Sequence, residues 1–187
     1  MVHVFKKVLS PERCQEFIDR MDKHWANESE LGNDIMDWSS RLIDITGEPI
    51  QQEIQSFLEK QLPVKLTCNQ VQIQIWPVGT QSKLHVHDYT YGRGNTDYNT
   101  MVYLNDNFKG GEFITIDGFE YKPEQGSVTF FDGSNVYHGL RRVYGEHRYT
   151  LIFWWTRTLF ELPSDRNPEI SDKARRSESS VDHIRLE

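Results

Sequence analysis

The sequence predicts an α+β domain in which two amphipathic helices come first and a series of short strands follows. Apolar residues recur at helical intervals in the first third of the chain, and from Lys65 onward they alternate with polar residues as in strands. Turn-forming residues separate the later runs, which favours an antiparallel sandwich or barrel with the helices as outer support.

The N-terminal third is expected to hold one short strand and two helices. Residues 2–8 are expected to form an edge strand, and Ser10 to cap a helix over about 11–26 that has proline at its first position. A second helix is expected over about 48–61, because apolar residues line one side of it and a proline follows. The intervening segment 27–46 is predicted to be rich in loops.

Strand patterns fill the chain beyond the second helix. In residues 66–76 apolar side chains alternate with Gln70, Gln72 and Gln74, which predicts a half-buried strand. Further strands are expected at 100–105, 111–117, 127–133 and 149–158. We therefore expect one domain over 1–162, with helical support over about 1–63, followed by a polar tail over 163–187.

Composition argues against several classes of protein. The formal net charge of −7 makes nucleic acid an unexpected partner. No stretch approaches the roughly 18 apolar residues of a membrane-spanning helix, and the N-terminus lacks the apolar core of a signal peptide. Cys14 and Cys68 match no disulfide or zinc spacing and are expected to be reduced thiols. These features predict a cytoplasmic protein without a membrane partner, and they give no indication of its oligomeric state.

Histidines at two distant places in the chain indicate a metal site. His85 and His87 alternate along one predicted strand, so both side chains project from the same face. Asp88 points the other way unless the strand ends or bulges there. His138 is a candidate ligand from the opposite side of the sandwich. Two histidines and a carboxylate on one face of iron leave positions for O2 and a co-substrate. By themselves, however, His85 and His87 are equally typical of a hydrogen-bonded pair without a metal. A lone histidine in a loop, such as His138, is more often a surface residue than a ligand.

Arg148 stands at the start of an apolar strand, ten residues after His138. A charged side chain in that position needs a carboxylate partner, because burial of an unpaired charge is costly. Its guanidinium group forms a planar fork that matches a carboxylate. Either a bound dicarboxylate or an internal Asp or Glu would satisfy it.

Seven short blocks, in order and with matching spacing, resemble the Fe(II)- and 2-oxoglutarate-dependent oxygenases, especially their prolyl 4-hydroxylase-like branch. The blocks are WPVG (76–79), HVHD (85–88), TMVYLN (100–105), GGEF (110–113), PEQG (123–126), His138, and RYTL (148–151) followed by Trp154. The resemblance implies a double-stranded β-helix, or jelly roll, over about 64–160, with the N-terminal helices packed outside it.

The resemblance also implies roles for individual residues. His85 and His138 would bind the iron, Arg148 would pair with the far carboxylate of 2-oxoglutarate, and Tyr103 would hydrogen-bond the same group. Fe(II) would be the metal, with 2-oxoglutarate and O2 as co-substrates. The expected reaction is hydroxylation of a C–H bond in a peptidyl, amino-acid or small-molecule substrate, with release of succinate and CO2.

One position departs from the pattern of that family, which has aspartate two residues after the first histidine. Here His87 occupies that position and Asp88 lies one residue late. Either a bulge lets Asp88 bind the iron, or His87 completes a three-histidine site. The departure keeps two other functions open: a cupin-type dioxygenase that does not use 2-oxoglutarate, and a non-catalytic jelly-roll binding module.

Two further expectations concern residues near these motifs. The polar loop after the histidines contains Asn95 and Asp97, which are candidates for substrate contact, although a solvated turn accounts for them equally well. His147 precedes Arg148, so strand alternation predicts that it faces the surface.

Overall fold

The computed structural model describes residues 1–28, 41–87 and 96–158. Within these ranges the chain forms two helices and twelve strands. In chain order they are β1 (Val2–Phe5), α1 (Pro11–Glu28), β2 (Arg41–Asp44), α2 (Pro49–Gln61), β3 (Leu66–Trp76), β4 (Ser82–His85), β5 (Tyr98–Tyr103), β6 (Lys109–Gly110), β7 (Phe113–Thr115), β8 (Glu120–Tyr121), β9 (Val128–Asp132), β10 (His138–Leu140), β11 (Val143–Tyr144) and β12 (Arg148–Arg157).

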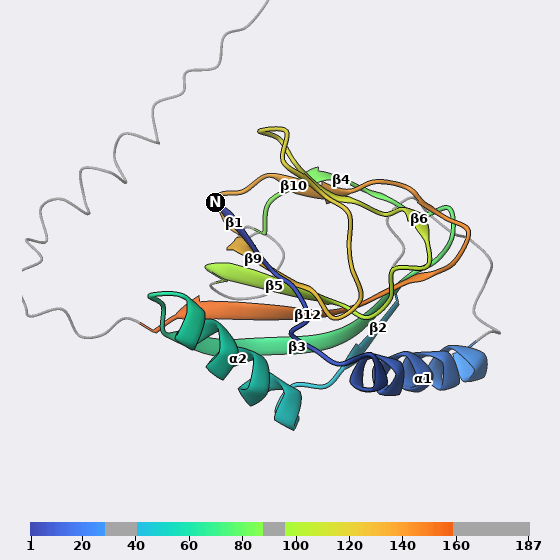
Figure 1. The fold of residues 1–187 in the computed structure, drawn as a ribbon, viewed down its shortest axis with the longest axis horizontal. Helices are drawn as coiled ribbons and strands as arrows, with labels where there is room; N and C mark the ends of the chain where they lie inside the picture. The colour runs from blue at the N-terminus through green and yellow to red at the C-terminus, as the bar shows by residue number, and fades with distance from the viewer. Residues whose placement is uncertain (29–40, 88–95, 159–187) are drawn as a thin grey trace, which may run out of the picture.

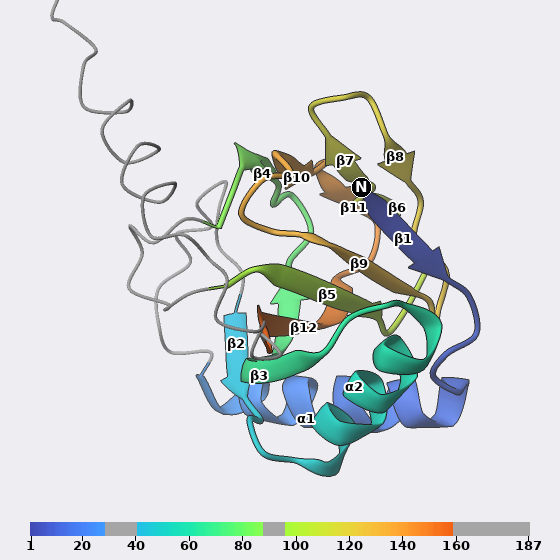
Figure 2. The same cartoon turned by 90° about the vertical axis from the view of Figure 1, so that its left-hand side faces the viewer.

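Two antiparallel sheets form the core of the fold. The larger sheet has the order β1-β9-β5-β12-β3-β2, and the smaller has the order β4-β10-β7-β8. The smaller sheet lies over one face of the larger, and both helices lie on the other face (Figure 1; Figure 2). This arrangement confirms the predicted α+β class with helical support outside the strands.

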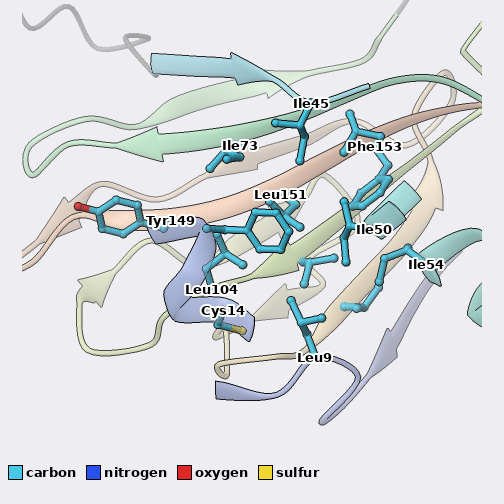
Figure 3. Close-up of a cluster of buried hydrophobic side chains, with 14 of the residues drawn as sticks. Leu9, Cys14, Ile45, Ile50, Ile54, Ile73, Leu104, Tyr149, Leu151 and Phe153 are labelled. Carbon is cyan, nitrogen blue, oxygen red and sulfur yellow. The ribbon is translucent and has the colours of Figure 1, made fainter. Parts of the chain in front are cut away.

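The helices pack on the larger sheet through apolar stripes. In α1 the side chains of Cys14, Phe17 and Met21 are buried, and in α2 those of Ile50 and Ile54 are buried. They meet the residues of β3 and β12 that point toward the helices (Figure 3). Each fully buried large apolar side chain stabilises the fold by about 1.5–3 kcal/mol, so this outer layer supplies much of the folding free energy.

Side chains along β12 alternate between the two faces of the larger sheet. Leu151 and Phe153 belong to the core beneath the helices. Ile152 and Trp154 belong to a second cluster, which faces the smaller sheet and includes Phe113 of β7. A single strand therefore lines both the structural core and the space between the sheets.

Two expectations differ from the structure. Segment 41–44, within the stretch 27–46 that was expected to be rich in loops, forms strand β2, which pairs with β3. Its run of only two apolar residues gives too weak a pattern to predict a strand. The half-buried expectation for β3 also fails, because Gln72 and Gln74 are each only 8% exposed. Their side chains project opposite to the apolar residues of β3, toward the space between the sheets, where Gln74 accepts a hydrogen bond from Thr150.

Other expectations fall partly outside the described residues. The predicted boundary at residue 162 and the tail over 163–187 cannot be placed, because the description ends at residue 158. Neither α1 nor α2 is long and apolar enough to cross a membrane. Cys14 and Cys68 are free thiols, as expected. Burial raises the pKa of Cys14 to about 11 and that of Cys68 to about 12, so both thiols stay protonated at neutral pH.

Candidate metal and co-substrate site

Three histidines converge between the two sheets. Antiparallel pairing of β4 with β10 sets His85 opposite His138, and His87 follows two residues later in the chain (Figure 1; Figure 2). One ring nitrogen of each histidine lies within 4.8 Å of the other two. The strand register therefore brings together side chains that are more than 50 residues apart in the sequence.

The orientation of two of these rings is fixed by backbone carbonyl groups. His85 Nδ1 lies 2.9 Å from the carbonyl oxygen of Lys83, and His138 Nδ1 lies 2.8 Å from that of Val136. A carbonyl oxygen can only accept, so each Nδ1 carries the proton and each Nε2 keeps its lone pair. This is the arrangement in which a neutral imidazole serves as a metal ligand.

The nitrogen atoms are spaced as a cation site would require. His85 Nε2 and His87 Nε2 lie 3.3 Å apart. The lone pair of His85 Nε2 faces a second ring nitrogen at that distance, and a shared cation would stabilise this approach. The donor set of clustered imidazoles suits iron, zinc, copper or nickel rather than magnesium or calcium.

Burial keeps two of the histidines neutral. The pKa of His138 lies well below its ordinary value because of burial, and because of the nearby His87 and His85. Burial also lowers the pKa of His85. Both rings are therefore neutral near pH 7 before any metal binds, with their lone pairs available.

Aromatic rings line the histidine cluster. The ring of Phe131 lies 4.6 Å from that of His138, and the ring of Trp154 lies 4.4 Å from that of His87. Phe113 stacks on His138 at 5.7 Å. These rings limit the access of water and lower the local dielectric, which strengthens electrostatic interactions at the cluster.

Arg148 enters the same intersheet space from the first position of β12. Only 1% of its surface is exposed, and its guanidinium carbon lies 5.1 Å from the centre of the Tyr103 ring. Its Nε has no hydrogen-bond partner, and no Asp or Glu within the described ranges forms an ion pair with it. Arg148 remains charged despite its burial. Among the described residues, Arg148 thus has no acidic partner.

Tyr103, Thr129 and Gly111 lie close to Arg148 or to one another in the space between the sheets. The hydroxyl group of Tyr103 lies 3.2 Å from that of Thr129, and burial raises its pKa to about 12, so the phenol stays protonated. Gly111, in the GGEF block, makes room for Arg148, since a Cβ there would lie 3.2 Å from Arg148 Cδ and 2.7 Å from the Phe108 ring.

Several inward-facing polar residues were not identified from the sequence. Thr129 contacts Tyr103, and Asn99 contacts His87. The Tyr121 hydroxyl and Gln72 Oε1 are buried without a hydrogen-bond partner. Alternation along β3, β5 and β9 could have placed three of these four on the inner face, but it could not have shown which of them contact the site.

Other predicted residues lie away from the cluster or outside the described ranges. Asp88 and Asn95 fall in 88–95, which is not described. The Asp97 carboxylate accepts a hydrogen bond from the backbone N–H of Arg157 at 2.6 Å, which anchors the end of β12. His147 is half-buried rather than at the surface, because its Nδ1 accepts a hydrogen bond from Val78.

Comparison with known proteins supports the fold. Residues 71–156 match the family model described as the 2OG-Fe(II) oxygenase superfamily, where 2OG is 2-oxoglutarate. This segment contains all three histidines as well as Tyr103 and Arg148. The search of curated proteins found no significant match.

Solved structures share the jelly-roll fold at low sequence identity. A viral collagen prolyl hydroxylase from Paramecium bursaria Chlorella virus-1, in complex with 2OG, is 19% identical with a TM-score of 0.65, over 85% of this chain and 96% of that one. A Pseudomonas putida prolyl-4-hydroxylase is 16% identical with a TM-score of 0.57, over 84% and 92%. A Trichoplax adhaerens prolyl hydroxylase, in complex with a hypoxia inducible factor oxygen degradation domain peptide fragment, is 13% identical with a TM-score of 0.64, over 96% and 87%.

These likenesses confirm the predicted double-stranded β-helix, and the family match covers its strand-rich core. Residues 71–156 match the 2OG-Fe(II) oxygenase superfamily, whose enzymes use Fe(II), 2-oxoglutarate and O2.

Proposed function

We propose that the protein hydroxylates a C–H bond in a peptidyl, amino-acid or small-molecule substrate. One observation carries the proposal: a convergent histidine cluster shares one intersheet space with Arg148, a buried cation that no acidic side chain of the described residues pairs with. The aromatic cluster that includes Phe113, Phe131 and Tyr103 connects them, since His138 packs on the first two and Arg148 on the third.

His85 and His138 are proposed to hold the iron. Each presents an Nε2 lone pair, because its Nδ1 donates to a backbone carbonyl. His87 and Asp88 are the candidates for the third ligand from this segment. Fe(II) suits imidazole donors and leaves positions for O2 and a co-substrate in such a facial arrangement.

Arg148 and Tyr103 are proposed to bind the far carboxylate of 2-oxoglutarate. The guanidinium group offers a bidentate fork, and the Tyr103 hydroxyl, beside that of Thr129, offers a further donor. Binding there would compensate for the burial of the Arg148 charge. When bound, Fe(II) with 2-oxoglutarate and O2 supplies an oxidant that can break a substrate C–H bond, and the co-substrate leaves as succinate and CO2.

The remaining residues around the site bind, orient and exclude water. Phe113, Phe131 and Trp154 pack against the histidines, which limits water near a reactive centre. Gln72 and Gln74 lie on the inner face of β3, and the unpartnered Gln72 Oε1 can accept a hydrogen bond from a polar substrate.

A peptidyl substrate is supported by the structural relatives. One of them is a collagen prolyl hydroxylase and another was solved with a peptide fragment bound. The backbone N–H groups of a peptide could also donate a hydrogen bond to Gln72 Oε1. Peptidyl proline is therefore the first class to test, followed by other amino-acid and small-molecule substrates.

An anaerobic Fe(II) titration, with and without 2-oxoglutarate, tests the metal and co-substrate parts of this proposal. We expect a weak visible charge-transfer band only when both are present, because the 2-oxo acid would chelate protein-bound iron. Iron binding without the band would favour a dioxygenase that does not use 2-oxoglutarate. Absence of iron binding would reduce the protein to a binding module.

A further inference from the structure

The Asn99 side chain, which lies outside the histidine cluster, forms a hydrogen bond with the ring of His87. It lies in β5 with 0% of its surface exposed, and its Oδ1 is 2.6 Å from His87 Nδ1. Its Nδ2 donates to the backbone carbonyl of Phe153 at 3.2 Å. Because that carbonyl only accepts, the amide group cannot be reversed without placing two acceptors against each other.

The fixed amide determines the tautomer of His87. Asn99 Oδ1 only accepts, so His87 Nδ1 must donate and must carry the proton. The lone pair is left on Nε2, which lies 3.3 Å from His85 Nε2. His87 therefore has the same arrangement as His85 and His138: Nδ1 donates to an oxygen and Nε2 is available to a cation.

The surrounding structure holds His87 in this position. Its backbone N–H donates to the Gly133 carbonyl at 2.8 Å, and Trp154 packs on its ring. A Cβ at residue 133 would lie 1.9 Å from Asn99 Oδ1 and 3.3 Å from His87 Nδ1. Glycine is thus required there for space, so that the amide group can reach the ring.

We propose that His87 is the third metal ligand, and that Asn99 is the positioning residue that fixes its Nδ1–H tautomer. The proposal rests on the metal centre proposed above and specifies it. Three neutral imidazoles then replace the two histidines and one carboxylate of the family pattern. A divalent ion in this site keeps its full charge of +2, so it attracts an anionic co-substrate more strongly than a carboxylate-ligated ion does.

Co(II) binding to the metal-free protein, followed by visible absorbance without 2-oxoglutarate or O2, tests the proposal. Asn99→Leu should weaken Co(II) affinity by about 10- to 100-fold, as is typical when a partner that orients a ligand is lost. Asn99→Asp should retain more affinity than Asn99→Leu, because one carboxylate oxygen still accepts from Nδ1 while the other loses the bond to the Phe153 carbonyl. Thr100→Val is the matched control, since it removes a buried hydrogen-bond acceptor of Trp155 from the same strand, β5, and should leave affinity unchanged.

Two further measurements separate positioning from general loss of structure. Long-range 1H–15N NMR of the metal-free protein should show His87 as the Nδ1–H tautomer, and as a mixture in Asn99→Leu. His87→Ala should abolish tight Co(II) binding, whereas Asp88→Ala should not.

Several outcomes would overturn the assignment. Wild-type affinity in Asn99→Leu, or an equal loss in Thr100→Val, would reject Asn99 as the positioning residue. An Nε2–H tautomer of His87, or a loss confined to Asp88→Ala, would reject His87 as the third ligand. If the wild-type protein itself fails to bind Co(II), the metal centre of the proposed function fails as well. Wild-type binding with an unaffected Asn99→Leu variant rejects only the role of Asn99.

Discussion

The two faces of the larger sheet are both buried, yet they differ in chemistry. Beneath the helices the side chains are almost entirely apolar, with Leu151 and Phe153 of β12 at the centre (Figure 3). Toward the smaller sheet the same strand presents Arg148 and Thr150, and β3 presents Gln72. The outer face therefore supplies stability, whereas the inner face supplies groups for binding.

The difference is clearest in the polar atoms that each face leaves without partners. Arg148 Nε, Gln72 Oε1 and the Tyr121 hydroxyl are all buried without a hydrogen bond. Each such atom costs about 1–3 kcal/mol, and more when it is charged. A bound ligand that satisfies them would offset this cost. Because neighbouring residues of one strand serve different purposes, substitutions in β12 can separate stability from function.

The largest effect is expected for His138→Ala. Loss of this ligand should abolish 2-oxoglutarate-dependent succinate formation, while the circular dichroism spectrum stays that of the folded protein. His3→Ala is the control, because that histidine packs against Phe5 and Phe130, which belong to the core on the helix side of the larger sheet. Full turnover in His138→Ala would place the metal elsewhere.

A smaller effect, on stability rather than on chemistry, is expected for Leu151→Ala. Its side chain is completely buried beneath the helices, so truncation should lower the free energy of unfolding by about 2–5 kcal/mol. Urea unfolding measures this change. The Co(II) affinity of the folded variant should match that of the wild type. A weakened metal site in Leu151→Ala would show that the two faces are coupled.

Arg148→Met should impair co-substrate binding without lowering stability, which is the reverse of the effect expected for Leu151→Ala. Loss of a charge-assisted carboxylate contact, worth about 1.5–3 kcal/mol, should raise the 2-oxoglutarate requirement by roughly 10- to 100-fold. Stability should be unchanged or higher, because the variant no longer buries a cation that the described residues leave without an acidic partner. Arg141→Met is the control, since Arg141 pairs with Glu120 on the exposed surface. If Arg148→Met has an unchanged 2-oxoglutarate requirement, the co-substrate binds somewhere other than at Arg148.

Features with a local cause were predictable from the sequence. Both helices follow from apolar periodicity and proline placement, and they appear close to the expected bounds. By contrast, β2 depends on pairing with β3, because Leu42 and Ile43 alone form too short a pattern. Burial of Gln72 was also missed, since alternation shows that a strand has a polar face but not what covers that face.

The candidate site likewise contains residues that the sequence predicts and residues that it does not. The block pattern pointed to His85, His138 and Arg148, and the strand register brings the two histidines together. Asn99 gave no signal, because its importance depends on contacts with His87 and Phe153 that only the folded sheet creates. Contacts of this kind depend on register and rotamer, which neither composition nor spacing determines.

The smallest predicted effect concerns pH and tests whether the inner face keeps its histidines neutral. Burial lowers the pKa of His138 and His85 in the fold, whereas the unfolded chain takes up protons near the ordinary value of about 6.5. Below that pH the unfolded state binds more protons, so the free energy of unfolding of the metal-free protein should fall as pH decreases. The slope is at most about 1.4 kcal/mol per pH unit for each histidine, and it ends below the lowered pKa.

Urea unfolding in chelator-containing buffers, from about pH 7.5 down to pH 5, measures this slope. His138→Ala removes the more deeply buried of these two groups and should flatten the profile. An identical slope in that variant would mean that carboxylates elsewhere dominate the acid response. Bound Co(II) should shift the loss of stability to lower pH, because protons must then compete with the metal for the same Nε2 lone pairs.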